Sequence, residues 1–217
     1  MPPRAVLFDF DGVIVDTENV HVAAWQRTLS RMGWELSDEA ALRAAEIDDR
    51  VFLTELFAAR KIERPDLDGW LGRKQELTES MLADAPQVYP GVSSLVEALR
   101  SKGVRLGIVT TTWRRNVEIV LQVSNLAGAF EVIIAKEDVE AVKPAPEGYR
   151  LALDRLKIST AEAVAIEDSP TGVEAARAAG LRVVAVGHRR PDGEWSGGHY
   201  LRDLADLATT LEILGLS

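Results

Sequence analysis

Cysteine is absent from this chain of 217 residues. Disulfide bonds, thiol catalysis and cysteine-ligated zinc sites are therefore excluded. Basic residues are in the minority, with 25 Lys and Arg against 34 Asp and Glu and a formal net charge of −9. Because binding to phosphate backbones depends on clustered Lys and Arg, we expect no nucleic acid among the main partners, and we interpret the acidity as a solvated surface.

Long hydrophobic runs are also missing, and none approaches the ~20 residues that a helix needs to cross a bilayer. The first ten residues, MPPRAVLFDF, contain one basic residue and then become strand-like, which is not the pattern of a signal peptide. The composition, 47% hydrophobic and 27% charged, is typical of a soluble globular protein. We therefore expect a cytoplasmic protein with no membrane partner.

Several catalytic and nucleotide-binding motifs are lacking as well. The first expected strand is followed by D-F-D-G rather than G-x-G-x-x-G, which argues against a dinucleotide-binding dehydrogenase. The sequence contains no P-loop, H-E-x-x-H or G-x-S-x-G pattern. Nucleoside triphosphatases, zinc peptidases of that type and serine hydrolases of the α/β-hydrolase type are therefore excluded.

Short apolar runs are present and predict buried parallel strands, because they are rich in Val and Ile and lack polar alternation. Helical patterns with readable ends lie between them: Gly103 follows one over Val92–Lys102, and Ser169-Pro170 and Gly180 bound another. This alternation predicts an α/β fold with a doubly wound, mostly parallel sheet. The expected strands are Ala5–Phe10, Arg105–Val109, Phe130–Ile134, Ala163–Ile166 and Val183–Val186.

The interval between the first two strands is unusually long. It is about three times the roughly 30 residues of a complete βαβ unit. Its residues carry helical patterns at about 18–32, 37–45, 48–59 and 69–83. We therefore expect an α-helical cap domain over residues 17–84, inserted into a catalytic core of residues 1–16 and 85–217. Ligands of open α/β sheets bind beyond the carboxyl ends of the strands, so this insert is expected to act as a lid.

Acidic residues stand at two of the predicted strand ends, in Asp9-Phe10-Asp11-Gly12 and in Glu167-Asp168. An alternative is that Asp11-Gly12 is only a turn and Asp9 an exposed strand end. If the strands are neighbours, however, burying these acids together is costly unless a cation or hydrogen-bond donors compensate. Mg²⁺ fits such a cluster of oxygens best.

Donors follow two other strands. Thr110-Thr111-Thr112 offers hydroxyl and backbone N–H groups, and Lys143-Pro144 offers a cation. Viewed singly, the threonines are explained by an ordinary helix N-cap and Lys143 by a surface position. Together with the acids, they form the equipment for phosphoryl transfer, in which positioning and charge neutralisation carry most of the catalysis.

These residues resemble the four motifs of the haloacid dehalogenase-like superfamily, in order and at strand ends. D-F-D-G-V-I-V-D at 9–16 is similar to the first motif, Thr110 fits the second, V-K-P-A-P with Lys143 the third, and I-E-D-S-P-T-G with Glu167-Asp168 the fourth. Within the superfamily, the chain resembles the β-phosphoglucomutase-like phosphatases with a helical cap. Tyr89-Pro90-Gly91 and the stretch His21–Trp25 add to that likeness.

The resemblance implies roles for the matching residues. Asp9 would be the nucleophile that forms an aspartyl-phosphate, and Asp11 the general acid and then base. Mg²⁺ would bind Asp9, the Asp11 carbonyl and Asp168, with Glu167 a direct or water-mediated ligand. The transferring phosphoryl group would be held by Thr110, the Thr111 backbone and Lys143.

In the cap, the resemblance places Thr17, His21, Trp25 and Lys74 near the cleft, and we expect Lys74 or Arg50 to contact the substrate. Plain packing of an amphipathic helix is an equal alternative for His21 and Trp25. Arg50 ends an acidic stretch, E-I-D-D-R, where the family often has a phosphate-binding arginine. Trp113-Arg114 stands where sugar-phosphate mutases often carry Lys-Asn. Both departures weaken a mutase assignment and leave the phosphatase motifs intact.

Three functions remain open at this point. The first is a Mg²⁺-dependent phosphatase acting on a small phosphorylated metabolite, and the second a β-phosphoglucomutase-like mutase. The third, a catalytically silent binding or regulatory module, is disfavoured by the intact acidic residues. Dehalogenation is also disfavoured, because the Mg²⁺-type ligands suit phosphoryl chemistry. The fold would work as a monomer, and the sequence leaves the oligomeric state open. We expect residues 187–199 to form a surface loop.

Overall fold

The chain divides into two compact units. One comprises Met1–Asp16 and Gln87–Ser217, and the other is Thr17–Pro86. The computed structural model describes residues 2–63, 65–188 and 198–216. Most of the surface loop expected over residues 187–199 therefore lies outside the described residues.

The first unit contains a sheet that confirms the predicted fold class. Its described part has six parallel strands in the order β5-β4-β1-β6-β7-β8. From the central β1, the chain adds strands on one side and then on the other, which is the doubly wound arrangement. The strands are β1 (Ala5–Phe8), β4 (Arg105–Val109), β5 (Val132–Ile134), β6 (Ala163–Glu167), β7 (Arg182–Val186) and β8 (His199–Leu201).

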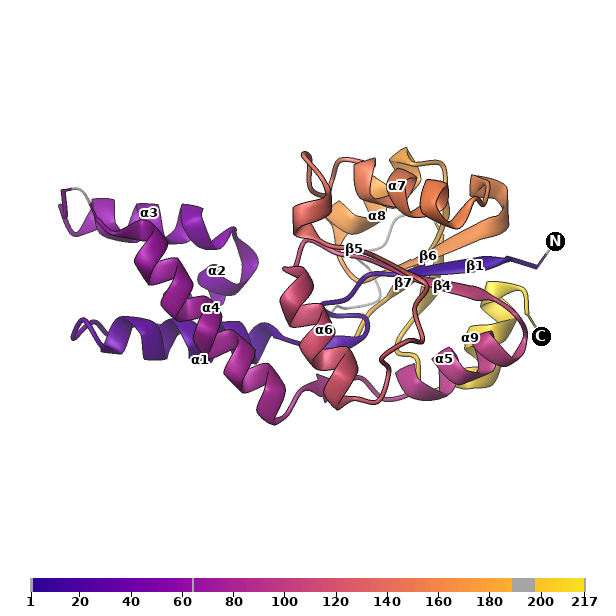
Figure 1. The fold of residues 1–217 in the computed structure, drawn as a ribbon, viewed down its shortest axis with the longest axis horizontal. Coiled ribbons are helices and arrows are strands. Elements are labelled where there is room, and N and C mark those ends of the chain that lie inside the picture. Colours follow the sequence, from indigo (N-terminus) through magenta and orange to yellow (C-terminus); the bar gives the residue numbers. More distant parts are fainter. Residues whose placement is uncertain (1, 64, 189–197, 217) are drawn as a thin grey trace. The chain divides into compact units, whose positions relative to one another are not determined.

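Helices cover both faces of this sheet (Figure 1). Those on one face are α5 (Val92–Ser101), α6 (Arg114–Val123) and α9 (Leu207–Leu214), and those on the other are α7 (Glu147–Leu156) and α8 (Pro170–Ala178). Because both faces are covered, β1 is buried at every position, as its unbroken apolar sequence predicts. The apolar core leaves only strand ends available for polar chemistry.

The helix ends expected from the sequence are observed. The Ser169 hydroxyl accepts a hydrogen bond from the Gly172 N–H and caps α8, whose first residue is Pro170. Gly103 and Gly180 follow α5 and α8 with positive φ angles of 75° and 88°, which glycine adopts without steric cost. These caps fix where α8 begins, directly after the acidic pair at the end of β6.

The threonines do not cap a helix. The helix after β4, α6, begins at Arg114 with Trp113 in the N-cap position and without a side-chain cap. The Glu137 carboxylate accepts from the Arg114 N–H instead, at 3.1 and 3.2 Å. Thr110, Thr111 and Thr112 therefore remain in the loop between β4 and α6.

The chain leaves and re-enters the first unit through a small antiparallel ribbon. It consists of β2 (Val15–Asp16) and β3 (Gln87–Val88), with Val15 opposite Val88 and Asp16 opposite Gln87. The Tyr89 N–H donates to the Ile14 carbonyl at 2.9 Å and extends this pairing. The two ends of the long insert are thus joined by backbone hydrogen bonds.

The second unit is helical, as the periodicity predicts. Its described helices are α1 (Glu18–Ser30), α2 (Asp38–Glu46), α3 (Asp49–Ala59) and α4 (Leu67–Asp84). Side chains of Ser37, Asp48 and Asp66 cap α2, α3 and α4. No helix in the described parts of the chain is long and apolar enough to cross a membrane.

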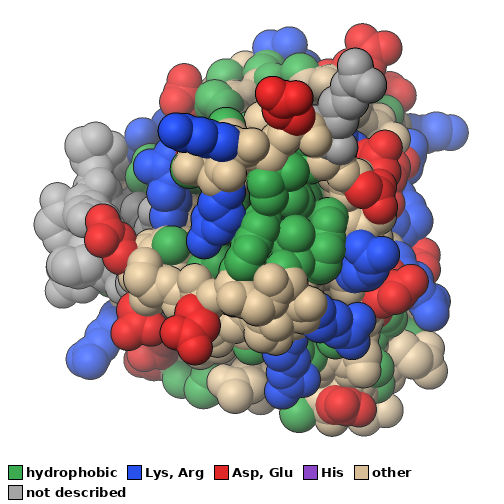
Figure 2. Space-filling view, turned by 90° about the vertical axis from the view of Figure 1, so that its left-hand side faces the viewer, with side chains coloured by type: hydrophobic (Ala, Val, Ile, Leu, Met, Phe, Trp, Pro, Cys, Tyr) green, Lys and Arg blue, Asp and Glu red, His purple; other side chains and the backbone are tan. Residues whose placement is uncertain are grey.

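The helical unit has a separate hydrophobic core. Trp25, Phe52 and Phe57 are buried in it, and the rings of Trp25 and Phe52 meet edge to face with centroids 5.0 Å apart. Trp34 and Trp70 are only partly buried against this core. Figure 2, which views the side that lies at the left in Figure 1, shows hydrophobic side chains gathered in the middle of that face and charged side chains around them.

Candidate active site

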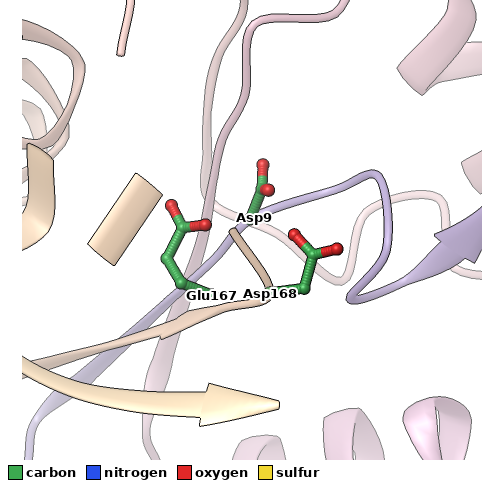
Figure 3. Close-up of side chains that lie close together, drawn as sticks. All are labelled: Asp9, Glu167 and Asp168. Carbon is green, nitrogen blue, oxygen red and sulfur yellow. The ribbon is translucent and has the colours of Figure 1, made fainter. Parts of the chain in front are cut away.

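Three carboxyl groups converge where β1 and β6 end. Asp9 follows β1, Glu167 is the last residue of β6, and Asp168 comes next. β1 and β6 pair with Phe8 opposite Ile166, so these acids lie at one edge of the sheet. One oxygen from each carboxylate lies within 4.8 Å of the others (Figure 3). The sequence predicts these residues at the ends of two strands, and the structure shows that the two strands are neighbours.

Two glycines allow the acids to approach the backbone closely. A Cβ atom on Gly12 would come within 1.8 Å of Asp168 Oδ2, and one on Gly172 within 2.0 Å of Glu167 Oε2. Gly12 also has a φ of +80°. The glycines of D-F-D-G and S-P-T-G therefore create the space that the two carboxylates occupy.

Lys143 bridges two of these acids. Its Nζ atom lies 2.8 Å from Asp9 Oδ1 and 2.7 Å from Glu167 Oε1. The Lys143 side chain is 8% exposed, so the ion pairs are formed in a largely dehydrated environment, where charge interactions are strong. The interpretation of Lys143 as a surface lysine is excluded.

Burial governs the protonation of this cluster. It raises the pKa of Asp9 although Lys143 opposes the shift. It also raises the pKa of Glu167 to about 8, with the charge of Asp9 adding to the effect. Burial opposes the charge of Lys143, but the carboxylates of Asp9 and Glu167 raise its pKa above the ordinary value. Asp9 and Glu167 therefore share one lysine between them.

The residues present fit a divalent cation of the magnesium type. The donors are carboxylate oxygens, the ligands that such hard cations prefer. Glu167 Oε2 is buried and has no hydrogen-bond partner among the described residues. A buried unsatisfied oxygen beside two further carboxylates is accounted for by an ion or by water bound to one.

Tyr149, which sequence reasoning did not identify, also belongs to this cluster. It is fully buried in α7, and its hydroxyl donates to Glu167 Oε1. Burial raises the pKa of the Tyr149 phenol well above its ordinary value, so the phenol stays protonated and acts as a donor.

Asp11 has a different environment from Asp9. Its carboxylate accepts a hydrogen bond from the Thr112 hydroxyl. The Thr112 N–H donates to the Thr110 hydroxyl oxygen at 3.0 Å, which ties the threonines together. Thr110 is buried and Thr111 is exposed. The sequence names Thr112 among the donors after β4, but its hydrogen bond to Asp11 is not predicted.

Three of the residues expected in the insert gather within the helical unit. The Lys74 ammonium donates to His21 Nδ1 at 2.7 Å and to Asp49 Oδ2 at 2.8 Å. The Trp25 indole donates to Asp49 Oδ1 at 3.0 Å. Lys74 is 1% exposed. Asp49, from the acidic stretch E-I-D-D-R, therefore links Lys74 to Trp25 in this buried polar group, although its own side chain is 29% exposed.

The two other expected insert residues have different surroundings, although the Thr17 carbonyl accepts a hydrogen bond from the His21 N–H at 2.9 Å. Arg50 lies on the surface and pairs with Asp68. Thr17 is buried at the N-cap of α1 without a side-chain capping bond. Asp49 is thus the residue of the acidic stretch that reaches the buried group, and Arg50 points to a different partner.

The residues that replace the mutase-type Lys-Asn pair are engaged in the first unit. Arg114 pairs with Asp138 and donates to the Ile133 carbonyl at 3.0 Å. Trp113 is 43% exposed, and Lys136 Nζ lies 5.3 Å from the centre of its ring. Arg114 therefore has a structural role at the edge strand β5.

Comparisons with known proteins agree with this geometry. The family model described as haloacid dehalogenase-like hydrolase matches residues 6–186. The chain is 32% identical over 192 residues to the phosphorylated carbohydrates phosphatase of Thermotoga maritima, with 88% of each chain covered. It is 36% identical over 193 residues to protein CbbY of Rhodobacter capsulatus, with 85% of each covered.

A solved structure is similar over nearly the whole chain. The crystal structure of CbbY from Rhodobacter sphaeroides in complex with phosphate has a TM-score of 0.83 at 28% identity, and 94% of this chain and 96% of that chain are covered. The family match runs from β1 to β7 and includes all four motifs. The chain therefore belongs to the haloacid dehalogenase-like hydrolase family and is one of its phosphatases.

Proposed function

We propose that this phosphatase depends on Mg²⁺ and hydrolyses a small phosphorylated metabolite, such as a sugar phosphate, through an aspartyl-phosphate on Asp9. The observation that carries the proposal is the position of the Asp9 carboxylate, 2.8 Å from Lys143 and beside two further acids. The printed name of the Thermotoga maritima relative, a phosphatase of phosphorylated carbohydrates, supports the substrate class.

Asp9 begins the reaction as the nucleophile. One of its oxygens attacks phosphorus, and the new O–P bond forms while the bond from phosphorus to the ester oxygen of the substrate breaks. Lys143 opposes the rise in the Asp9 pKa that burial causes, which favours the ionised carboxylate. Mg²⁺ would be held by Asp9, the Asp11 carbonyl and Asp168, with Glu167 binding directly or through water, and when bound it neutralises charge on the phosphoryl group.

Asp11 moves the protons. In its acid form it donates a proton to the departing ester oxygen, which leaves as an alcohol. It then accepts a proton from water as the water oxygen attacks the phosphorus of the aspartyl-phosphate. This second step releases inorganic phosphate and restores the Asp9 carboxylate. The hydrogen bond from Thr112 holds the Asp11 carboxyl between these steps.

The phosphoryl group would be held by neighbouring donors. The Thr110 hydroxyl and the Thr111 backbone N–H directly follow β4, and the Lys143 ammonium comes from the loop before α7. Fixed donors aimed at a transferring group stabilise the charge that develops on its oxygens. We propose this role for all three residues.

We further propose that the insert, expected over residues 17–84, selects the substrate, with Thr17, His21, Trp25, Arg50 and Lys74 as the residues involved. Alanine at Lys74 or Arg50 should then change the ranking of substrates, while hydrolysis of a small activated ester persists. Initial rates on a set of phosphate esters measure this ranking. Equal losses on every substrate would contradict a role in selection.

The main experiment is a screen of the purified protein against phosphorylated sugars, polyols and nucleotides with Mg²⁺ present. We expect release of inorganic phosphate from a subset of sugar or polyol phosphates. An isomerised sugar phosphate without phosphate release would instead indicate a mutase, and turnover of none of them would favour a silent module.

We propose that the enzyme acts as a cytoplasmic monomer, consistent with its acidic, cysteine-free composition.

A further inference from the structure

Tyr149 is an unusual residue for its position. It is fully buried in the core beneath β4 and β5, where a phenylalanine would fill the same space without a polar atom to satisfy. A buried hydroxyl is unfavourable unless it is hydrogen-bonded, and this one donates to the Glu167 carboxylate. The Tyr149 ring also contacts Lys143, whose Nζ atom lies 5.5 Å from the ring centre.

The hydrogen bonds of Glu167 are unevenly distributed between its two oxygens. Oε1 accepts from both Lys143 and Tyr149. Oε2 is buried against Gly172 and has no hydrogen-bond partner within the described part of the chain. Two donors fixed on one oxygen hold the plane of the carboxylate, so the other oxygen keeps one direction.

We infer that Tyr149 is a positioning residue of the cation site, because its hydroxyl fixes the orientation of the Glu167 carboxylate. Glu167 Oε2 is then left for the cation or for a water molecule bound to it. Lys143 stays between Glu167 and Asp9. The inference rests on the proposed function, because it assigns Tyr149 to the Mg²⁺ site proposed there. Groups that orient metal ligands through hydrogen bonds contribute to metal affinity although they do not touch the metal.

The test replaces Tyr149 by phenylalanine, which keeps the ring and removes the hydroxyl. We expect Tyr149→Phe to raise the Kd for Mg²⁺, measured by titration calorimetry without substrate, by about 10- to 100-fold. The control is Tyr200→Phe on β8, which removes a hydroxyl from the far edge of the sheet and should leave the Kd unchanged. An unchanged Mg²⁺ affinity in a folded Tyr149→Phe protein would overturn the inference.

A double-mutant cycle with Glu167→Gln separates positioning from general packing. If Tyr149 acts through the Glu167 carboxylate, Tyr149→Phe should raise the Kd for Mg²⁺ by a factor at least several times smaller in the Glu167→Gln protein than in the otherwise unaltered protein. Equal losses in both backgrounds would show that the hydroxyl does not act through Glu167, and the inference would be wrong.

A second measurement keeps the native fold. The chain has three tyrosines, so fluorine NMR of protein labelled with 3-fluorotyrosine gives three signals. The phenylalanine variants assign these signals. If Tyr149→Phe does not fold, Tyr89→Phe and Tyr200→Phe identify the Tyr149 signal by elimination. Mg²⁺ should shift the Tyr149 signal more than that of Tyr200, and a Tyr149 signal insensitive to saturating Mg²⁺ contradicts the inference. If the unaltered protein neither binds Mg²⁺ nor releases phosphate, the proposed function itself has failed.

Discussion

Asp9 and Asp11 are two residues apart, yet their carboxylates have different neighbours. Asp9 pairs with Lys143 at the end of β1, whereas Asp11 accepts a hydrogen bond from Thr112 in the loop after β4. The Lys143 ammonium opposes the rise in the Asp9 pKa that burial causes, whereas the Asp11 carboxylate has a neutral hydroxyl as its neighbour. The two roles that we propose for these like residues therefore correspond to two different sets of partners.

Asparagine substitutions should distinguish these roles. Asp9→Asn removes the proposed nucleophile, so phosphoenzyme formation and turnover should both disappear. Asp11→Asn keeps the nucleophile but cannot take a proton from water, so hydrolysis of the aspartyl-phosphate should slow by about 10²–10⁴-fold. With an activated ester as substrate, intact-mass and peptide-mass measurements should detect a phosphate adduct on Asp9 in the Asp11→Asn protein.

The control for this experiment is the unaltered enzyme, in which the adduct should turn over before it accumulates. An adduct on a residue other than Asp9 would show that the nucleophile has been assigned wrongly. Normal activity of Asp9→Asn would lead to the same conclusion.

The catalytic set could be predicted from sequence only in part, for a physical reason. Asp9 and Glu167 stand at the ends of apolar strands, and parallel strands bring such ends to one edge. Lys143 lies in the loop before α7 and reaches both acids from there. Thr112 and Tyr149 act on partners 101 and 18 residues away in the chain. No periodicity or spacing within the sequence specifies those hydrogen bonds, because they depend on how α7 and the β4–α6 loop pack.

At the level of secondary-structure elements, the first turn of α8 lies against the Glu167 carboxylate. At position 172 of that turn, only glycine leaves room for the carboxylate. Alanine normally stabilises a helix relative to glycine by about 0.5–1 kcal/mol. At Gly172, however, the added Cβ would lie 2.0 Å from Glu167 Oε2, which is buried. We expect Gly172→Ala to lower both the free energy of unfolding and the Mg²⁺ affinity, measured by denaturant titration and calorimetry.

Gly72 in α4 provides the matched control. A Cβ there meets no atom within 4 Å, so Gly72→Ala should raise the free energy of unfolding by about 0.5–1 kcal/mol and leave Mg²⁺ binding unchanged. If Gly172→Ala behaved like Gly72→Ala, the close packing of Glu167 on α8 would be disproved.

The buried polar group of the helical unit should make its stability depend on pH. Burial, with the neighbouring Lys74, lowers the pKa of His21 to about 4, against an ordinary value of 6.5. Between these values the unfolded chain binds a proton that the folded one does not, so the free energy of unfolding should fall as the pH drops from about 7 to 4. The pKa difference corresponds to at most roughly 3 kcal/mol.

Thermal unfolding between pH 7 and pH 4 tests this expectation by comparing the chain with its His21→Gln variant. The variant should lose less stability over that range, because glutamine does not titrate. The same slope in both proteins would mean that His21 is not buried in its neutral form.

Two further features of the elements were not anticipated from sequence. β8 has only three residues, His199–Leu201, at the edge of the sheet, and such a strand has no apolar run to reveal it. The sequence shows Asp49 only as part of an acidic stretch. Its pairing with Lys74 and Trp25 was not anticipated, because these residues lie on other helices. Periodicity predicts helices well since burial repeats with each turn, whereas pairing between helices depends on their tertiary packing.

For the molecule as a whole, Mg²⁺ should act as a stabilising ligand as well as a catalytic one. Asp9, Glu167 and Asp168 repel one another, and a bound cation relieves that repulsion only in the folded state. At a concentration 100 times its Kd, Mg²⁺ should raise the free energy of unfolding by about 2.7 kcal/mol. The melting temperature, followed with and without Mg²⁺, measures this effect.

Asp168→Ala should remove most of the Mg²⁺-dependent shift and weaken Mg²⁺ binding more than folding. Asp154→Ala, which removes an exposed acid from α7, is the charge-matched control and should keep the shift. Full phosphatase activity in excess chelator would contradict the assignment of a Mg²⁺ site.

The β2–β3 ribbon makes the insert an exchangeable module. Asp16 and Gln87 are opposite each other in the ribbon, and directly paired Cα atoms of antiparallel strands are only about 4.5–5.5 Å apart. A two-residue hairpin turn could span that distance, as could any helical unit whose ends lie equally close. Lineages that share these motifs could thus exchange or enlarge the insert, and a protein engineer could graft a new one, without shifting the register of β1.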